Sequence, residues 1–186
     1  GYAVTRTTSS PLANLLKQLA FIPYLVPGIS FAVAYLSLFA VQRGPIPALY
    51  GTTIILILIL AADEVPFASR SGISSMMQLG REAEEASMNT GASWTQTMRK
   101  IVLPIQKSAL AAAFVLPFIS ATQSLSPVII LATPETNLLT TLSMNLVDYG
   151  YTHAANGVTM MICLVALLGM VITRKVLKVD MGRGIG

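Results

Sequence analysis

The chain has 186 residues, of which 54% are hydrophobic and only 11% are charged, and its formal net charge is +4. Soluble globular domains contain about 25% charged residues, so this composition excludes an ordinary water-soluble domain. The mean hydropathy of +0.69 also indicates a membrane protein. The basic residues are scattered around apolar runs and form no stripe, which argues against nucleic acid as a partner. We therefore expect an all-α, polytopic membrane helix bundle.

Four apolar segments are long enough to cross a bilayer, since a spanning helix needs about 20 mostly apolar residues. They lie at about residues 19–41, 46–66, 108–133 and 153–173. We expect Asp63 and Glu64 to end the helix of the second segment. Prolines interrupt the first and third segments, at Pro23, Pro27, Pro117 and Pro127. These prolines indicate either simple helix bending or broken helices that line a pathway.

The distribution of Lys and Arg predicts the orientation of the spans. Eleven basic residues lie before the first span, in the long connection 67–107 and after the last span, whereas Arg43 alone lies on the other side. We therefore expect both termini and the 67–107 loop to face the cytoplasm. Residues 1–186 form a single transmembrane domain in this interpretation.

The 67–107 loop contains the pattern of two short helices joined at a glycine. A stripe of mostly small residues repeats at helical spacing, at Leu79, Ala83, Ala86 and Thr90. Gly91 suits a left-handed helix end, and Ser93 can cap a second helix. That helix would present Trp94, Met98 and Ile101 on one face, with Arg99 and Lys100 near its end. An amphipathic hairpin resting on lipid headgroups is the simpler interpretation.

The same stretch resembles the signature loop of binding-protein-dependent ABC importer permeases. The family pattern is Glu-Ala-Ala, three residues, Gly, nine residues and Ile-x-Leu-Pro, and this chain departs from it only at Ser87. The matching positions are Glu85, Ala86, Ser87, Gly91, Ile101, Leu103 and Pro104. The resemblance implies a type I importer permease fold, in which the loop forms a coupling helix that docks on an ATPase. By this resemblance Glu85 contacts the ATPase, Gly91 makes the turn, and Ala86 and Ser87 allow close approach.

The resemblance also implies partners and a location. The partners would be a cytoplasmic ABC ATPase dimer, a second permease subunit or fused half, an extracytoplasmic solute-binding protein and membrane lipid. The location would be the bacterial inner membrane. Family members usually have more spans before the loop, and the sequence opens with Gly1, so we expect an N-terminally incomplete chain.

No constellation in the sequence predicts catalysis, a cofactor or a metal site. The phosphate-binding pattern Gly-Lys-Ser/Thr is missing from the sequence, so any ATPase activity is expected on a separate subunit. Cys163 is the only cysteine and His153 the only histidine. We interpret Cys163 as a buried apolar side chain and His153 as an interfacial polar residue.

The third span holds the densest group of polar side chains. Its candidates for lining a pathway are Gln123, Ser124 and Ser126, and hydrogen bonding between helices is the more ordinary explanation of the group. Leu125-Ser126, Thr133–Thr136 and Asn145–Gly150 are similar to the ferric-iron, phosphonate and thiamine branch of permeases, which implies ferric iron or a similar small ion or phosphonate as solute. A secondary carrier or a membrane protein without transport function is the alternative. An ion-coupled carrier needs an intramembrane charge, and we expect none within the four spans.

Overall fold

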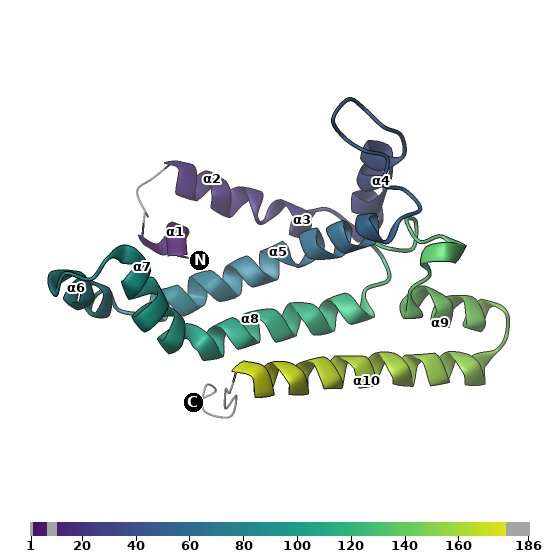
Figure 1. Cartoon of the computed structure of the whole chain (residues 1–186). Helices are drawn as coiled ribbons and strands as arrows, with labels where there is room; N and C mark the ends of the chain where they lie inside the picture. Colours follow the sequence, from purple (N-terminus) through teal and green to yellow (C-terminus); the bar gives the residue numbers. More distant parts are fainter. Residues whose placement is uncertain (1, 7–10, 178–186) are drawn as a thin grey trace.

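The computed structural model of the chain describes residues 2–6 and 11–177, and its architecture is helical (Figure 1). Over these residues there is no strand, and one isolated β-bridge joins Arg43 to Ile46. The α-helices are α1 (Tyr2–Arg6), α2 (Pro11–Leu19), α3 (Ile22–Leu25), α4 (Gly28–Phe39), α5 (Thr53–Gln78), α6 (Glu82–Asn89), α7 (Trp94–Thr97), α8 (Leu103–Gln123), α9 (Leu139–Asp148) and α10 (Thr152–Leu177). The all-α prediction is confirmed.

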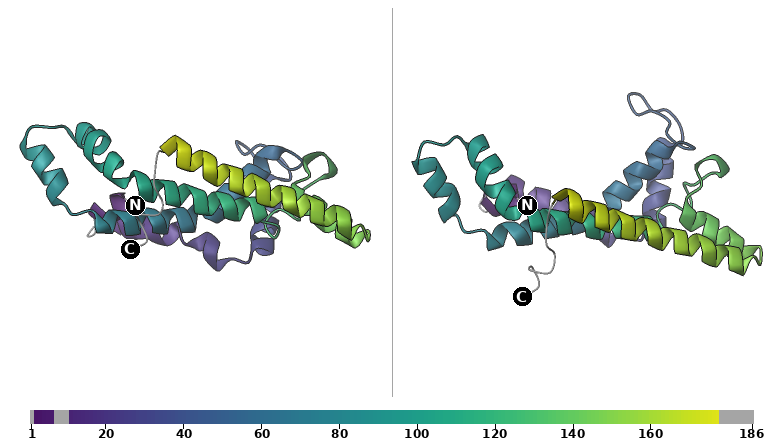
Figure 2. Two further views of the ribbon diagram at one scale, coloured as in Figure 1. Left: turned by 90° about the horizontal axis from the view of Figure 1, so that it is seen from below. Right: turned by 60° about the horizontal axis from the view of Figure 1, so that its bottom comes forward.

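Three long helices determine the shape of the molecule. In both figures α8 lies between α5 and α10, and the three helices run side by side (Figures 1 and 2). Helices α6 and α7 project from one end of this layer, whereas α4 and α9 lie at the other end. The two ends of the layer are therefore formed by different helices, α6 and α7 at one end and α4 and α9 at the other.

The first apolar segment is not one continuous helix, so of the two alternatives for its prolines the structure shows a broken helix and not simple bending. Residues 19–41 contain the end of α2, all of α3 and all of α4. Pro23 lies in the first turn of α3, and Pro27 caps α4 in an extended conformation, so both prolines start helices. The 12 residues of α4 extend about 18 Å, which is shorter than a hydrocarbon core of about 30 Å.

Helix α5 corrects the expectation that Asp63 and Glu64 end the second span. The helix continues through both carboxylates and through Pro66 to Gln78, so residues 67–78 are helical and belong to α5. Acidic side chains do not interrupt backbone hydrogen bonds, and a proline removes only one donor. Glu64 is 8% exposed in the middle of this helix.

The third apolar segment is also shorter as a helix than the sequence predicted. Helix α8 ends at Gln123, and the chain then turns back over 126–131. Val128 and Leu131 from this turn are fully buried against Ala32 of α4 and Ile55 and Ile59 of α5. The burial of apolar side chains therefore fixes the turn at the end of the bundle opposite α6.

Two helical stretches among the described residues are long and apolar enough to cross a membrane. They are Trp94–Gln123, which has 30 residues and includes α7 and α8, and Thr152–Val176, which has 25 residues. The count of four spans thus stays a prediction. Helix α10 approaches α8 closely at Gly169, where an added Cβ would lie 2.0 Å from Cε1 of Phe118.

Candidate functional site

The site that the sequence singled out is a helical hairpin of α6, a turn and α7, residues 82–97, which we call the α6–α7 hairpin. Gly91 has a φ of +84°, the left-handed conformation predicted for it. Its N–H donates to the carbonyl of Met88 over 2.9 Å and closes the end of α6. Ser93 then starts α7 through a capping box with Gln96, whose side chain accepts the N–H of Ser93 at 2.9 Å. Both local predictions are confirmed.

The second helix of the hairpin does not end at Arg99 and Lys100, which corrects the sequence interpretation. It continues through a π-helical turn, Met98–Val102, directly into α8. In that turn the N–H of Leu103 donates to the carbonyl of Met98, five residues earlier. Because Pro104 follows and has no N–H, the wider turn lets the helix absorb a proline without breaking. The hairpin is thus a direct extension of a long helix.

Ser87 lies on the inner side of the hairpin. Its hydroxyl oxygen is 2.9 Å from that of Thr97, and the two side chains are only 9% and 3% exposed. This pair joins α6 to α7. Serine at this position, where the family pattern has alanine, therefore has a specific hydrogen-bonding partner.

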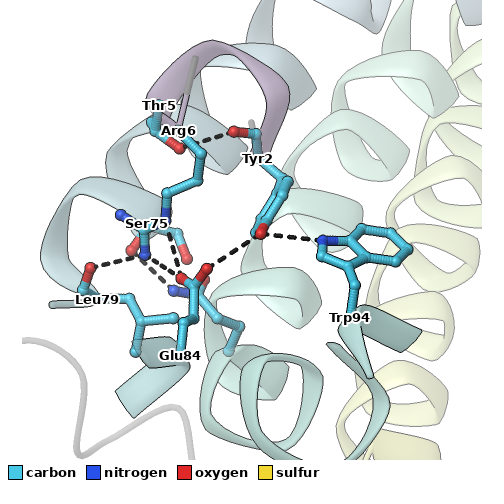
Figure 3. A network of polar contacts seen from close by, with 8 residues as sticks. Tyr2, Thr5, Arg6, Ser75, Leu79, Glu84 and Trp94 are labelled. Atoms are coloured by element: carbon cyan, nitrogen blue, oxygen red, sulfur yellow. Dashed lines mark hydrogen bonds and ion pairs between the residues drawn. The ribbon is translucent and has the colours of Figure 1, made fainter. Parts of the chain in front are cut away.

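Glu84 anchors the hairpin to the start of the chain (Figure 3). Its side chain is 5% exposed, accepts the hydroxyl of Tyr2 at 3.1 Å and forms an ion pair with Arg6, whose Nε lies 2.8 Å from Oε1. Arg6 also donates to the carbonyl of Leu79 at 3.0 Å, and the indole N–H of Trp94 donates to the Tyr2 hydroxyl at 3.1 Å. The sequence does not reveal this network, because Glu84 looks like its acidic neighbours Glu82 and Glu85 and its partners Tyr2 and Arg6 are distant in the chain.

The outer side of the hairpin exposes the other predicted residues. Glu85, Ala86 and Gly91 are exposed, and beside them Met88 and Trp94 are 45% and 53% exposed. The remaining predicted positions lie where the hairpin joins α8: Ile101 is half-buried, whereas Leu103 and Pro104 are exposed. The exposed face is partly apolar, and the buried contacts of Glu84 and Ser87 lie behind it.

The predicted pathway residues lie at the opposite end of α8. Gln123 is its exposed last residue, and Ser126 is exposed in the following turn. Ser124 caps the helix, and its backbone carbonyl accepts the hydroxyl of Thr140 at 3.1 Å. The three residues are therefore grouped at one end of the bundle, and the polar contact of Ser124 uses its backbone.

A buried carboxylate, that of Glu64, lies between α5 and α8. Ser120 of α8 lies beside the Glu64 carboxylate, and within the described residues Oε2 of Glu64 has no hydrogen-bonding partner. Helix α5 runs on through Glu64, so this carboxylate lies within a helix and not at its end, while the expectation that the four spans lack a charge stays a prediction. In the part of the chain that the structure describes, no three His, Cys, Asp or Glu side chains gather as a metal site would require.

Comparison with known proteins places these features in a family. Two relatives are ferric transport permeases. FbpB of Actinobacillus pleuropneumoniae is 29% identical over 156 residues, which cover 82% of this chain and 22% of that protein. The putative FbpB 1 of Haemophilus influenzae is 34% identical over 124 residues, which cover 66% of this chain and 19% of that protein. The sulfate permease CysT of Salmonella typhimurium is 28% identical over 172 residues, covering 85% and 61%. The chain thus spans about a fifth of the length of the two ferric relatives.

The fold is shared with a solved structure. A bacterial ABC transporter involved in the import of the acidic polysaccharide alginate superposes with a TM-score of 0.73, at 17% identity, over 91% of this chain and 67% of that one. The architecture is therefore that of an ABC importer permease. The family profile described as binding-protein-dependent transport system inner membrane component matches residues 1–178. The chain belongs to this family of bacterial inner membrane transport components.

Proposed function

We propose that this chain is part of the permease of an ATP-driven importer and that the α6–α7 hairpin receives the movement of a cytoplasmic ATPase. The observation that carries the proposal is the hairpin itself. Its outer face exposes Glu85, Ala86 and Trp94, and its inner face is fixed by Glu84 and Ser87. A rigid element continuous with α8 can transmit a push along the bundle, whereas a flexible loop would absorb it.

The partners follow from what the chain itself supplies. The sequence holds no phosphate-binding loop, so nucleotide would be bound by a separate ATPase dimer. A second permease subunit or fused half would complete the pathway, and an extracytoplasmic binding protein would deliver the solute to the end that carries α4 and α9. In this orientation the α6–α7 hairpin, Tyr2 and Leu177 face the cytoplasm, in accord with the excess of Lys and Arg at that end.

We propose a small inorganic ion as the solute, with ferric iron as the first candidate. The support is that two relatives are ferric transport permeases and a third is a sulfate transport permease. Radiolabelled ferric iron and sulfate offered to the complete transporter in vesicles would decide between them, with uptake counted in the presence and absence of ATP. If neither ferric iron nor sulfate is taken up in an ATP-dependent way, this choice of solute is excluded.

The docking proposal is tested by purifying the complete transporter through a tag on the permease and measuring how much ATPase accompanies it. Glu85→Lys reverses a charge on the exposed face, and Gly91→Pro removes both the left-handed turn and the N–H that closes α6. Both variants are expected to lose the ATPase. Glu135→Lys makes the same charge change at an exposed position at the other end and should retain it. Retention of the ATPase by both hairpin variants would exclude the proposed docking surface.

A further inference from the structure

A groove lies between the N-terminal helices and α5, away from the α6–α7 hairpin surface. It has a volume of about 870 Å³ and is formed by residues of α2, α3 and α5, with Val4 of α1 at one side. Its apolar walls include Leu16, Ile22, Leu25 and Ile73. Neither the docking face nor the pathway residues take part in it, so the proposed function leaves this groove without a role.

The polar side of the groove is cationic. Lys17 of α2 and Arg70 of α5 both line it, and its described lining contains no carboxylate. The guanidinium carbon of Arg70 lies 4.6 Å from the centre of the Phe21 ring, a cation–π contact that holds the charge at the edge of the groove. Both cations are exposed, so an anionic group can reach them.

Helix α2 has the character of a helix that lies at a membrane surface. Leu12, Leu15 and Leu19 are 62%, 50% and 50% exposed, and the same helix carries the basic residue Lys17. An amphipathic helix with exposed leucines and a basic residue suits the boundary between headgroups and acyl chains. Arg70 lies in the half of α5 that leads to the hairpin, the end proposed to face the cytoplasm (Figure 1).

We propose that this groove binds one anionic phospholipid of the inner leaflet. The lipid phosphate lies between Lys17 and Arg70, and an acyl chain lies along Leu16, Ile22 and Ile73. The charge of the lining selects this occupant, because two cations with no carboxylate in the described lining favour an anionic headgroup over a zwitterionic one. Basic pockets between helices on the cytoplasmic side are suited to such lipids. The assignment of the leaflet rests on the orientation given under the proposed function.

The test uses the complete transporter in phosphatidylcholine nanodiscs that contain a photoactivatable phosphatidylglycerol. Labelled peptides are identified by mass spectrometry. Labelling is expected on peptides of α2 and α5, and unlabelled phosphatidylglycerol should compete while soluble glycerol phosphate should not. A photoactivatable phosphatidylcholine should label these peptides at least about fivefold less, the ratio expected from the loss of attraction to a single cation. Equal labelling by both lipids, or competition by glycerol phosphate, would overturn the proposal.

Variants test the two cations directly. Lys17→Gln combined with Arg70→Gln should reduce labelling at least about fivefold, whereas Lys17→Arg combined with Arg70→Lys should preserve it. Arg43→Gln removes a cation outside the groove and serves as the matched control. If the double glutamine variant labels like wild type, or if a protein segment cross-links into the groove in place of lipid, the site is not a lipid site. Co-purification of the ATPase with each variant reports separately on the proposed function.

Discussion

The hydroxyl oxygens of Ser87 and Thr97 lie 2.9 Å apart, with both side chains buried between α6 and α7. Removing one hydroxyl leaves the other buried without a partner, so Ser87→Ala alone is expected to destabilise the α6–α7 hairpin by about 1–3 kcal/mol. Combining Ser87→Ala with Thr97→Val removes both polar groups and should restore most of that loss. Hydrogen exchange of the hairpin amides in the purified transporter measures the free energy of opening. Strictly additive effects of the two substitutions would contradict the pairing.

The ion pair of Glu84 and Arg6 gives a second prediction. The two side chains are only 5% and 14% exposed, so Arg6→Met leaves a buried carboxylate without its counter-charge and should destabilise the contact by about 3–5 kcal/mol. Faster hydrogen exchange throughout α6 would report the loss. Glu82→Gln changes an exposed glutamate of the same helix and should leave exchange unchanged. Unchanged exchange in Arg6→Met would show that Glu84 does not anchor the hairpin.

These two contacts illustrate which parts of the site the sequence could predict. The turn at Gly91 and the cap at Ser93 depend on interactions within a few residues, so the local sequence predicts them correctly. The environment of Glu84 depends on Tyr2 and Arg6, about eighty residues away, and no local pattern encodes it. The π-helical turn before Pro104 is not predicted for a related reason. The apolar spacing in α7 and in α8 shows two helices but does not show that they are joined into one.

The same distinction explains the errors in the fold. Hydropathy predicted the apolar segments, whereas Pro23 and Pro27 left open whether residues 19–41 bend or break, and the structure divides them into separate helices. It also treated Asp63 and Glu64 as a boundary, although Glu64 is buried against the helix that carries Ser120. Packing between α5 and α8, which a single sequence does not reveal, decides that carboxylate's position.

Gly169 and Gly157 of α10 provide a matched pair. Alanine is favoured over glycine inside a helix by about 1 kcal/mol, so Gly157→Ala, where an added Cβ meets nothing within 4 Å, should stabilise the protein. At Gly169 the added Cβ would collide with the ring of Phe118. Overpacking of this kind costs about 1–3 kcal/mol, so Gly169→Ala should destabilise. Thermal unfolding of the purified transporter compares the two variants, and equal shifts would show that α8 and α10 are not in contact there.

Labelling of single cysteines tests the proposed orientation. Cys163 is the only cysteine of the chain and is replaced by serine, after which Trp94→Cys and Tyr149→Cys place one thiol at each end of the bundle. Both native side chains are well exposed, at 53% and 76%. A membrane-impermeant maleimide added to intact spheroplasts should label the cysteine at 149 and should reach the one at 94 only after lysis. The reverse pattern would place the hairpin outside and remove the ATPase docking surface.

Substitution of Glu64 tests whether transport uses a charge inside the bundle, as an ion-coupled carrier would. A carrier driven by an ion gradient requires an ionisable side chain that binds the ion inside the bundle, and Glu64, buried in α5 with one oxygen unpartnered, is the residue that could serve. In an importer driven by ATP the carboxylate only joins α5 to α8 near Ser120. Glu64→Gln keeps the shape and removes the charge, so ATP-dependent uptake should persist, as it should in Asp63→Asn. Loss of ATP-dependent uptake in Glu64→Gln while the ATPase still co-purifies would show that the charge of Glu64 takes part in transport, and would contradict a purely structural role for this carboxylate.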